Sequence, residues 1–190
     1  MRLFIAVDLP NDIRKELIEI ERKLKPLTDS AKWVSPESIH ITLKFLGEVP
    51  SKRMDDIDAA LAGLTWKPFT VTVHGVGFFP GPRSPRILWA GMEAPTMRRL
   101  AERLDTRMER LGFEKEKRGF RPHVTLARAR DTRMDTALVK AAAEYTEHEF
   151  GSFTADRIFL VQSTLKPAGP IYQKVKEYLL EQRSASPGSQ

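Results

Sequence analysis

Two short segments of the chain repeat one pairing of histidine with threonine. The first is His-Ile-Thr-Leu at residues 40–43, and the second is His-Val-Thr-Leu at residues 123–126. Alternating polar and apolar residues, many of them β-branched, indicate that both segments are strands. Side chains two residues apart point to the same face of a strand, so each segment presents an imidazole beside a hydroxyl, backed by an apolar face.

Two such pairs suit in-line displacement at phosphorus. Histidine titrates near neutral pH, so one imidazole can deprotonate an attacking water while the other protonates the leaving oxygen. Threonine hydroxyls can donate hydrogen bonds to the non-bridging phosphate oxygens. Two copies of the motif in a chain with only four histidines are far more specific than one. We therefore expect His40, Thr42, His123 and Thr125 to form the site, with no metal ion and no cofactor.

Strands and helices are predicted in a similar order around each motif, and this order suggests that the chain has two related halves. Residues 80–85 contain three prolines and must form a loop. The spacing of apolar residues in 171–182 indicates a helix, and the polar residues 184–190 predict a disordered tail. The patterns predict strands at 2–9, 38–47, 69–79, 86–92, 121–128, 149–154 and 157–163, and helices at 12–25, 51–61, 95–111 and 135–145.

Composition limits the class of protein. The 190 residues allow one domain or two small lobes with a real core. The net charge of +6 weakly favours a polyanionic partner. The absence of cysteine excludes disulfides, thiolate catalysis and zinc–thiolate sites. We find neither a signal-peptide pattern nor an apolar run near the roughly 20 residues that span a bilayer, so we expect a cytoplasmic protein without membrane contact.

The two motifs and their flanks resemble those of the 2H phosphoesterases. Within that superfamily, the chain is similar to the RNA 2′,3′-cyclic phosphodiesterases, also called 2′-5′ RNA ligases. The resemblance covers nearly the whole chain except the tail. Its flanking segments are residues 2–6, 33–34, 43–47, 85–89 and 126–128.

This resemblance implies a fold. It predicts an α+β, bilobal architecture in which two pseudo-symmetric antiparallel sheets surround a central cleft, with helices outside. Residues 1–183 would form this single domain, and residues 184–190 would be the tail. The resemblance also implies a strand at residues 171–180, against the helical spacing noted above.

The resemblance also implies an activity. It predicts metal-independent hydrolysis of an RNA 2′,3′-cyclic phosphate to a 2′-phosphate, with His40 as the general acid and His123 as the general base. Thr42 and Thr125 would hold the phosphate. The near-equivalent settings of the two histidines leave an exchange of their roles open, and the same groups could run the reverse ligation to a 5′-hydroxyl. We expect a monomer whose partner is RNA with a cyclic phosphate end.

Two other functions remain open. One is a cyclic phosphodiesterase acting on small cyclic nucleotides or sugar phosphates, for which turnover would depend weakly on salt. The other is a non-catalytic module that binds RNA or nucleotides in the cleft, whose binding would survive loss of both histidines.

Three residues beside the motifs are assigned by strand alternation. Arg128 lies five residues after His123, so a regular strand points it away, whereas a bulge or the strand end could turn it back to bind phosphate. We keep both interpretations of Arg128. Alternation also predicts that Phe45 packs in the core rather than stacking on a base. Lys44 would either line the cleft or be solvated at the strand end.

The paired histidines predict a bell-shaped dependence of the reaction rate on pH, because one imidazole must be neutral while the other is protonated. Steady-state rates across the neutral range test this. A profile without one of its two limbs near neutrality would argue against paired acid–base catalysis.

Overall fold

The computed structural model describes residues 1–166 and 169–180, so the predicted tail at 184–190 lies outside the described residues. Apart from the helix indicated at residues 171–182, the predicted strands and helices are present in this part of the chain, with small shifts of their ends. The strands are β1 (Arg2–Val7), β2 (Ala31–Trp33), β3 (Ile41–Glu48), β4 (Phe69–Phe79), β5 (Ile87–Glu93), β6 (His123–Ala129), β7 (Glu149–Ala155), β8 (Arg157–Lys166) and β9 (Gly169–Leu179). The α-helices are α1 (Asn11–Leu24), α2 (Met54–Ala62), α3 (Pro95–Glu109) and α4 (Thr136–Ala143).

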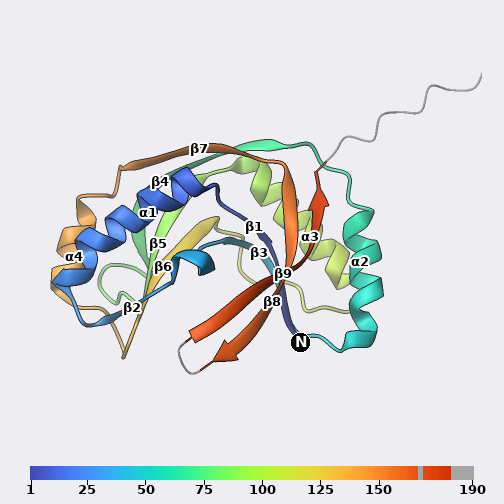
Figure 1. The fold of residues 1–190 in the computed structure, drawn as a ribbon, viewed down its shortest axis with the longest axis horizontal. Coiled ribbons are helices and arrows are strands. Elements are labelled where there is room, and N and C mark those ends of the chain that lie inside the picture. Colours follow the sequence, from blue (N-terminus) through green and yellow to red (C-terminus); the bar gives the residue numbers. More distant parts are fainter. Residues whose placement is uncertain (167–168, 181–190) are drawn as a thin grey trace, which may run out of the picture.

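The strands form one curved antiparallel sheet (Figure 1), which confirms the α+β class. Its order is β7-β4-β5-β6-β3-β1-β8-β9, with β2 paired to β6. The two predicted sheets are therefore the halves of this sheet, β7-β4-β5-β6 and β3-β1-β8-β9. The halves meet where β3 pairs with β6, and the register records one residue pair there, Ile41 with Val124.

The helices lie outside the sheet (Figure 1). Helix α1 contacts β7 and α4, whereas α3 contacts β3 of one half, β4 of the other half, and α2. Apolar residues three or four positions apart explain these packings. The buried residues are Ile13, Leu17, Ile20 and Leu24 in α1, and Met97, Leu100, Ala101, Leu104 and Met108 in α3.

Strand β1 is buried on both faces, which explains its almost continuous apolar sequence. Leu3, Ile5 and Val7 belong to the large core under the helices. Phe4 and Ala6 point to the other face, where they form a second cluster with Phe159, Val161 and the partly buried Tyr172. This second cluster forms an apolar floor beside the junction of the halves.

The prediction of a helix at residues 171–182 is wrong, and the strand implied by the family resemblance is correct. The apolar residues that gave helical spacing do not face a core: Ile171, Val175 and Leu179 are 56%, 42% and 50% exposed. Residues 169–179 instead pair with β8 along its length. Tyr178 is buried and donates a 2.8 Å hydrogen bond to Asp58 of α2. Non-local hydrogen bonding therefore overrides the local periodicity.

Close packing on the second half of the sheet requires glycine beside Trp89. Trp89 pairs with Thr125 in the register of β5 and β6, so its side chain shares the face of the second motif. A Cβ atom at Gly77 of β4 would lie 2.4 Å from Cζ2 of the Trp89 ring, and one at Gly91 would lie 3.0 Å from Cζ3. The indole ring therefore packs directly against the backbone of these two glycines.

Gly77→Ala should lower the free energy of unfolding by about 1–3 kcal/mol, because the added methyl group must displace a rigid ring. Urea denaturation measures this. Gly81→Ala is the matched control, since a Cβ atom there meets nothing within 4 Å. Equal stability of the two variants would contradict the packing argument.

Candidate active site

The two motifs meet at the junction of the sheet halves. Ile41 pairs with Val124, and both side chains are fully buried under the helices. The flanking side chains of each motif therefore point to the opposite face. Continuing the antiparallel register by one residue on each side sets His40 against Thr125, and Thr42 against His123.

Each imidazole is oriented by a backbone carbonyl two residues before it. His40 Nδ1 lies 2.7 Å from the Ser38 carbonyl oxygen, and His123 Nδ1 lies 2.7 Å from that of Arg121. A carbonyl oxygen only accepts hydrogen bonds, so Nδ1 carries the hydrogen in both rings. Nε2 is then the atom free to exchange a proton. In His40, Nε2 lies 3.0 Å from Thr42 Oγ1.

Aromatic side chains enclose both rings. Phe4 stacks on His40 with 4.7 Å between ring centroids, and Tyr172 meets His40 edge-on at 4.9 Å. Phe79 meets His123 edge-on at 5.1 Å. These contacts exclude water from part of each ring.

Burial lowers the pKa of both histidines. For His40, the Ser38 carbonyl and the Asp8 carboxylate act against this effect and raise the pKa, while Arg14 and Arg128 lower it further. For His123, the Arg121 carbonyl raises the pKa and Arg128 lowers it. In the free protein both rings therefore favour the neutral form, and the nearby carboxylate distinguishes His40 from His123.

A bulge turns Arg128 toward the histidines. The register of β5 with β6 shifts between Leu88 and Trp89, and Leu126 and Ala127 are both buried in succession. Alternation is thus interrupted by one residue, and Arg128 returns to the face of His123. The Arg128 cation lowers the pKa of His40, His123 and Tyr172 alike, so it acts on both motifs.

The same interruption in β3 overturns the predictions for Lys44 and Phe45. Leu43 and Lys44 are buried in succession, and the register of β1 with β3 shifts beside them. Lys44 therefore points into the helix side, where its Nζ lies 2.6 Å from Asp105 Oδ1 and donates to the Glu114 carbonyl at 2.5 Å. Phe45 is 61% exposed, with its ring centroid 6.0 Å from that of Phe4. Strand alternation predicted the wrong directions for these two side chains because it assumes a regular strand without a bulge.

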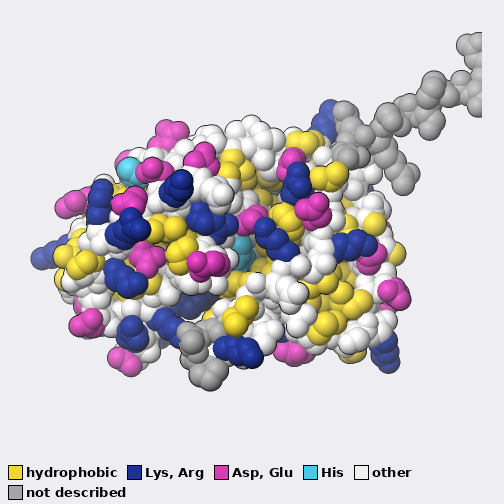
Figure 2. Space-filling model, viewed as in Figure 1, with side chains coloured by type: hydrophobic (Ala, Val, Ile, Leu, Met, Phe, Trp, Pro, Cys, Tyr) yellow, Lys and Arg dark blue, Asp and Glu magenta, His cyan; other side chains and the backbone are white. Residues whose placement is uncertain are grey.

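A pocket opens beside His40. Its walls come from the end of β1, the turn before His40, β8 and β9, and Figure 2 shows histidine atoms near the middle of this face among charged and apolar side chains. In the described part of the chain, no three His, Cys, Asp or Glu side chains are grouped as metal ligands would be. The pocket is lined by Ala6, Val7, Asp8, Glu37, Ile39, His40, Phe159, Val161, Tyr172 and Lys174.

Sequence reasoning missed several neighbours of the histidines. Phe79 gave no signal beyond its place at the end of a predicted strand, and Tyr172 lay in a segment whose spacing indicated a helix. Asp8 and Arg14 came from a predicted strand end and a predicted helix, with nothing to link them to His40.

None of the described helices is long and apolar enough to cross a membrane.

Comparison with known proteins matches most of this chain to one family. A family model described as LigT-like phosphoesterase matches residues 7–89 and 91–172. Proteins named RNA 2′,3′-cyclic phosphodiesterase from Archaeoglobus fulgidus and Methanothermobacter thermautotrophicus are 36% and 34% identical over 179 and 183 residues. These alignments cover 94% and 95% of this chain, and 99% of each relative.

The fold is also similar to that of solved structures. A crystal structure of a protein from Thermus thermophilus has a TM-score of 0.82 and 33% identity, covering 97% of this chain and all of that chain. Escherichia coli LigT complexed with 3′-AMP has a TM-score of 0.78 and 28% identity, covering 95% of this chain and 98% of that chain.

Arg128→Gln should raise the pKa of both His40 and His123, because removing a cation favours the protonated imidazole. Titration of the ring protons by NMR measures both values in one sample. Arg130→Gln is the matched control, because Arg130 does not act on either ring. If the pKa of only one histidine shifted, this would contradict the conclusion that Arg128 acts on both motifs.

Proposed function

Because the chain belongs to the LigT-like phosphoesterase family, we propose that it hydrolyses RNA 2′,3′-cyclic phosphate ends to 2′-phosphates, with His40 and His123 as acid and base. The observation that carries this proposal is the meeting of the two His-x-Thr pairs across the pairing of Ile41 with Val124. The names of the relatives in Archaeoglobus and Methanothermobacter support the substrate.

The reaction follows from the free Nε2 atoms. Nε2 of His123 accepts a proton from water as the water oxygen bonds to phosphorus in line with the 3′-oxygen. The bond from phosphorus to the 3′-oxygen breaks, and protonated His40 gives its Nε2 proton to that oxygen. The product carries a 2′-phosphate and a free 3′-hydroxyl. The two imidazoles supply the proton transfers in this scheme without a metal ion.

Local charge distinguishes the two histidines. Arg128 lowers the pKa of both rings and Arg14 lowers that of His40, whereas the Asp8 carboxylate raises the pKa of His40 alone. A carboxylate beside His40 would stabilise its protonated form, and this supports His40 as the acid and His123 as the base. A bound phosphate would raise both pKa values, since an anion favours imidazolium.

The remaining cleft residues fit a nucleotide phosphate. Thr42 and Thr125 would donate hydrogen bonds to the non-bridging oxygens, and Arg128 would neutralise their charge. The exposed ring of Phe45 offers a flat apolar surface of the kind on which nucleobases stack. With a 5′-hydroxyl of a second strand in place of water, the same groups would form a 2′-5′ linkage.

The decisive experiment is turnover of a short oligonucleotide with a 2′,3′-cyclic phosphate end in excess EDTA. His40→Ala and His123→Ala should each lower kcat by about 10²–10⁴-fold, since each removes one proton transfer. The product should be the 2′-phosphate. His74→Ala is the matched control, because His74 is an exposed residue of β4 outside both motifs.

Three outcomes would overturn the proposal: no turnover by the parent, turnover indifferent to both substitutions, or activity lost with EDTA. A 3′-phosphate product would contradict the assigned leaving oxygen. Parent activity on cyclic mononucleotides alone would redirect the assignment to a small-molecule phosphodiesterase.

A further inference from the structure

The orientation of His40 depends on the turn that precedes it. Residues Pro36–Ser38 form a single 3₁₀ turn, and Ile39 connects that turn to His40. The Ser38 carbonyl accepts the Nδ1 hydrogen of His40 at 2.7 Å. The position of this carbonyl therefore decides which ring nitrogen carries the hydrogen and where Nε2 points.

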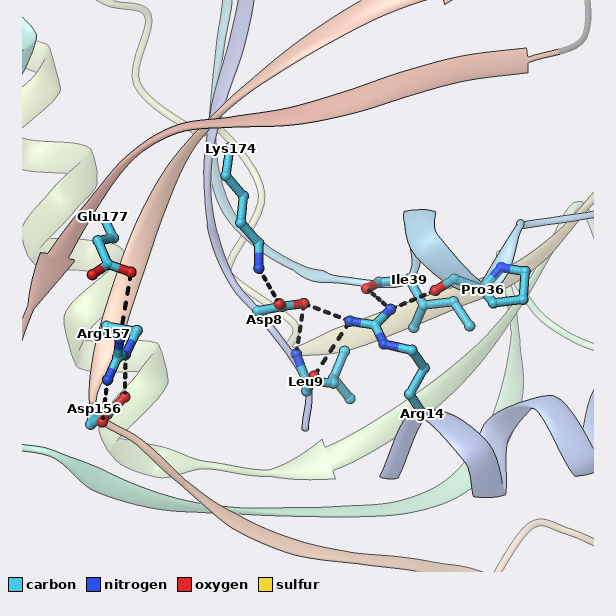
Figure 3. A network of polar contacts seen from close by, with 9 residues as sticks. All are labelled: Asp8, Leu9, Arg14, Pro36, Ile39, Asp156, Arg157, Lys174 and Glu177. Atoms are coloured by element: carbon cyan, nitrogen blue, oxygen red, sulfur yellow. Dashed lines mark hydrogen bonds and ion pairs between the residues drawn. The ribbon is translucent and has the colours of Figure 1, made fainter. Parts of the chain in front are cut away.

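One arginine from helix α1 binds both ends of this turn. Arg14 Nη1 donates to the Pro36 carbonyl at 2.5 Å and to the Ile39 carbonyl at 2.8 Å. Its Nη2 donates to Asp8 Oδ1 at 2.6 Å and to the Leu9 carbonyl at 3.3 Å (Figure 3). The side chain is only 16% exposed. A planar guanidinium thus connects the end of β1 to the residues on both sides of Ser38.

Asp8 fixes the arginine in return. Its Oδ1 accepts hydrogen bonds from Arg14 and from the backbone N–H of Leu9 at 3.0 Å, while its Oδ2 accepts one from Lys174 of β9 at 2.5 Å (Figure 3). Three elements, β1, α1 and β9, therefore converge on the turn before His40. A lysine in place of Arg14 could not reproduce this arrangement, because an ammonium group lacks the rigid fork that reaches two carbonyls and a carboxylate together.

We propose that Arg14 is a positioning residue for His40, which fixes the turn at residues 36–39 so that the Ser38 carbonyl holds the imidazole with Nε2 toward the cleft. The catalytic consequence rests on the proposed function. Arg14 does not contact the reacting atoms in this assignment. It acts through the turn.

His123 provides an internal reference. Its own Nδ1 partner is the Arg121 carbonyl, at the end of the segment 113–121, and in the described part of the chain no hydrogen bond from α1 reaches this segment. That segment is instead bound by Lys44, which donates to the Glu114 carbonyl, and by Asp105, which accepts from the Glu116 N–H at 3.1 Å. Loss of Arg14 should therefore disturb one histidine and leave the other unchanged.

The test compares Arg14→Gln and Arg14→Lys with Arg22→Gln. Arg22 lies on the same helix, and it pairs with Glu19 in a position where its side chain is 71% exposed. Nitrogen-15 NMR of the imidazole rings reports which nitrogen carries the hydrogen. In both Arg14 variants we expect His40 to populate both tautomers, with His123 unchanged, and kcat for the cyclic-phosphate oligonucleotide to fall by about 10–100-fold with little change in KM. Arg22→Gln should match the parent.

The outcomes separate the two proposals. Parent-like kcat and a single His40 tautomer in Arg14→Gln would overturn the positioning role. Full recovery in Arg14→Lys would also overturn it, because charge alone would then suffice. Equal disturbance of both histidines would overturn it too, since it would indicate a general loss of stability. Absence of turnover in the parent would refute the proposed function, while the NMR measurement would still test the link from Arg14 to His40.

Discussion

The pairing of Ile41 with Val124 is the contact on which the candidate site depends. Both side chains are buried, so a shift of register by one residue would turn each motif to the wrong face and expose apolar groups. The pair also joins the two halves of the sheet at one point. This pairing brings the polar faces of two motifs, 83 positions apart in the chain, onto one surface.

The two halves share a framework but differ in the side chains they present. Each motif strand has a bulge at the third and fourth residues after its histidine, and each bulge returns the fifth residue to the cleft face. That residue is Phe45 in one half and Arg128 in the other. A similar backbone therefore presents an exposed aromatic ring in one half and a cation in the other.

Among the described residues, neither imidazole is oriented by a direct hydrogen bond to an acidic residue. Backbone carbonyls of Ser38 and Arg121 fill that role, so the precision of each ring depends on how firmly its preceding segment is held. Arg14 binds the turn before His40, whereas the buried Lys44 binds the Glu114 carbonyl, at the start of the loop that leads to His123. Different contacts therefore hold the two segments.

The sequence alone determined the motif residues and most strands and helices, because alternation and helical spacing are local properties of segments that bury one face. The α+β class followed from the resemblance that those motifs carry. It did not determine the directions of Lys44, Phe45 and Arg128, since a bulge shifts alternation without changing composition. It misassigned residues 171–182, where pairing with β8 outweighs the spacing of exposed apolar residues. Only the tertiary structure linked Arg14 and Asp8 to His40, because contacts between a helix, a strand end and a distant turn arise from packing and leave no local pattern.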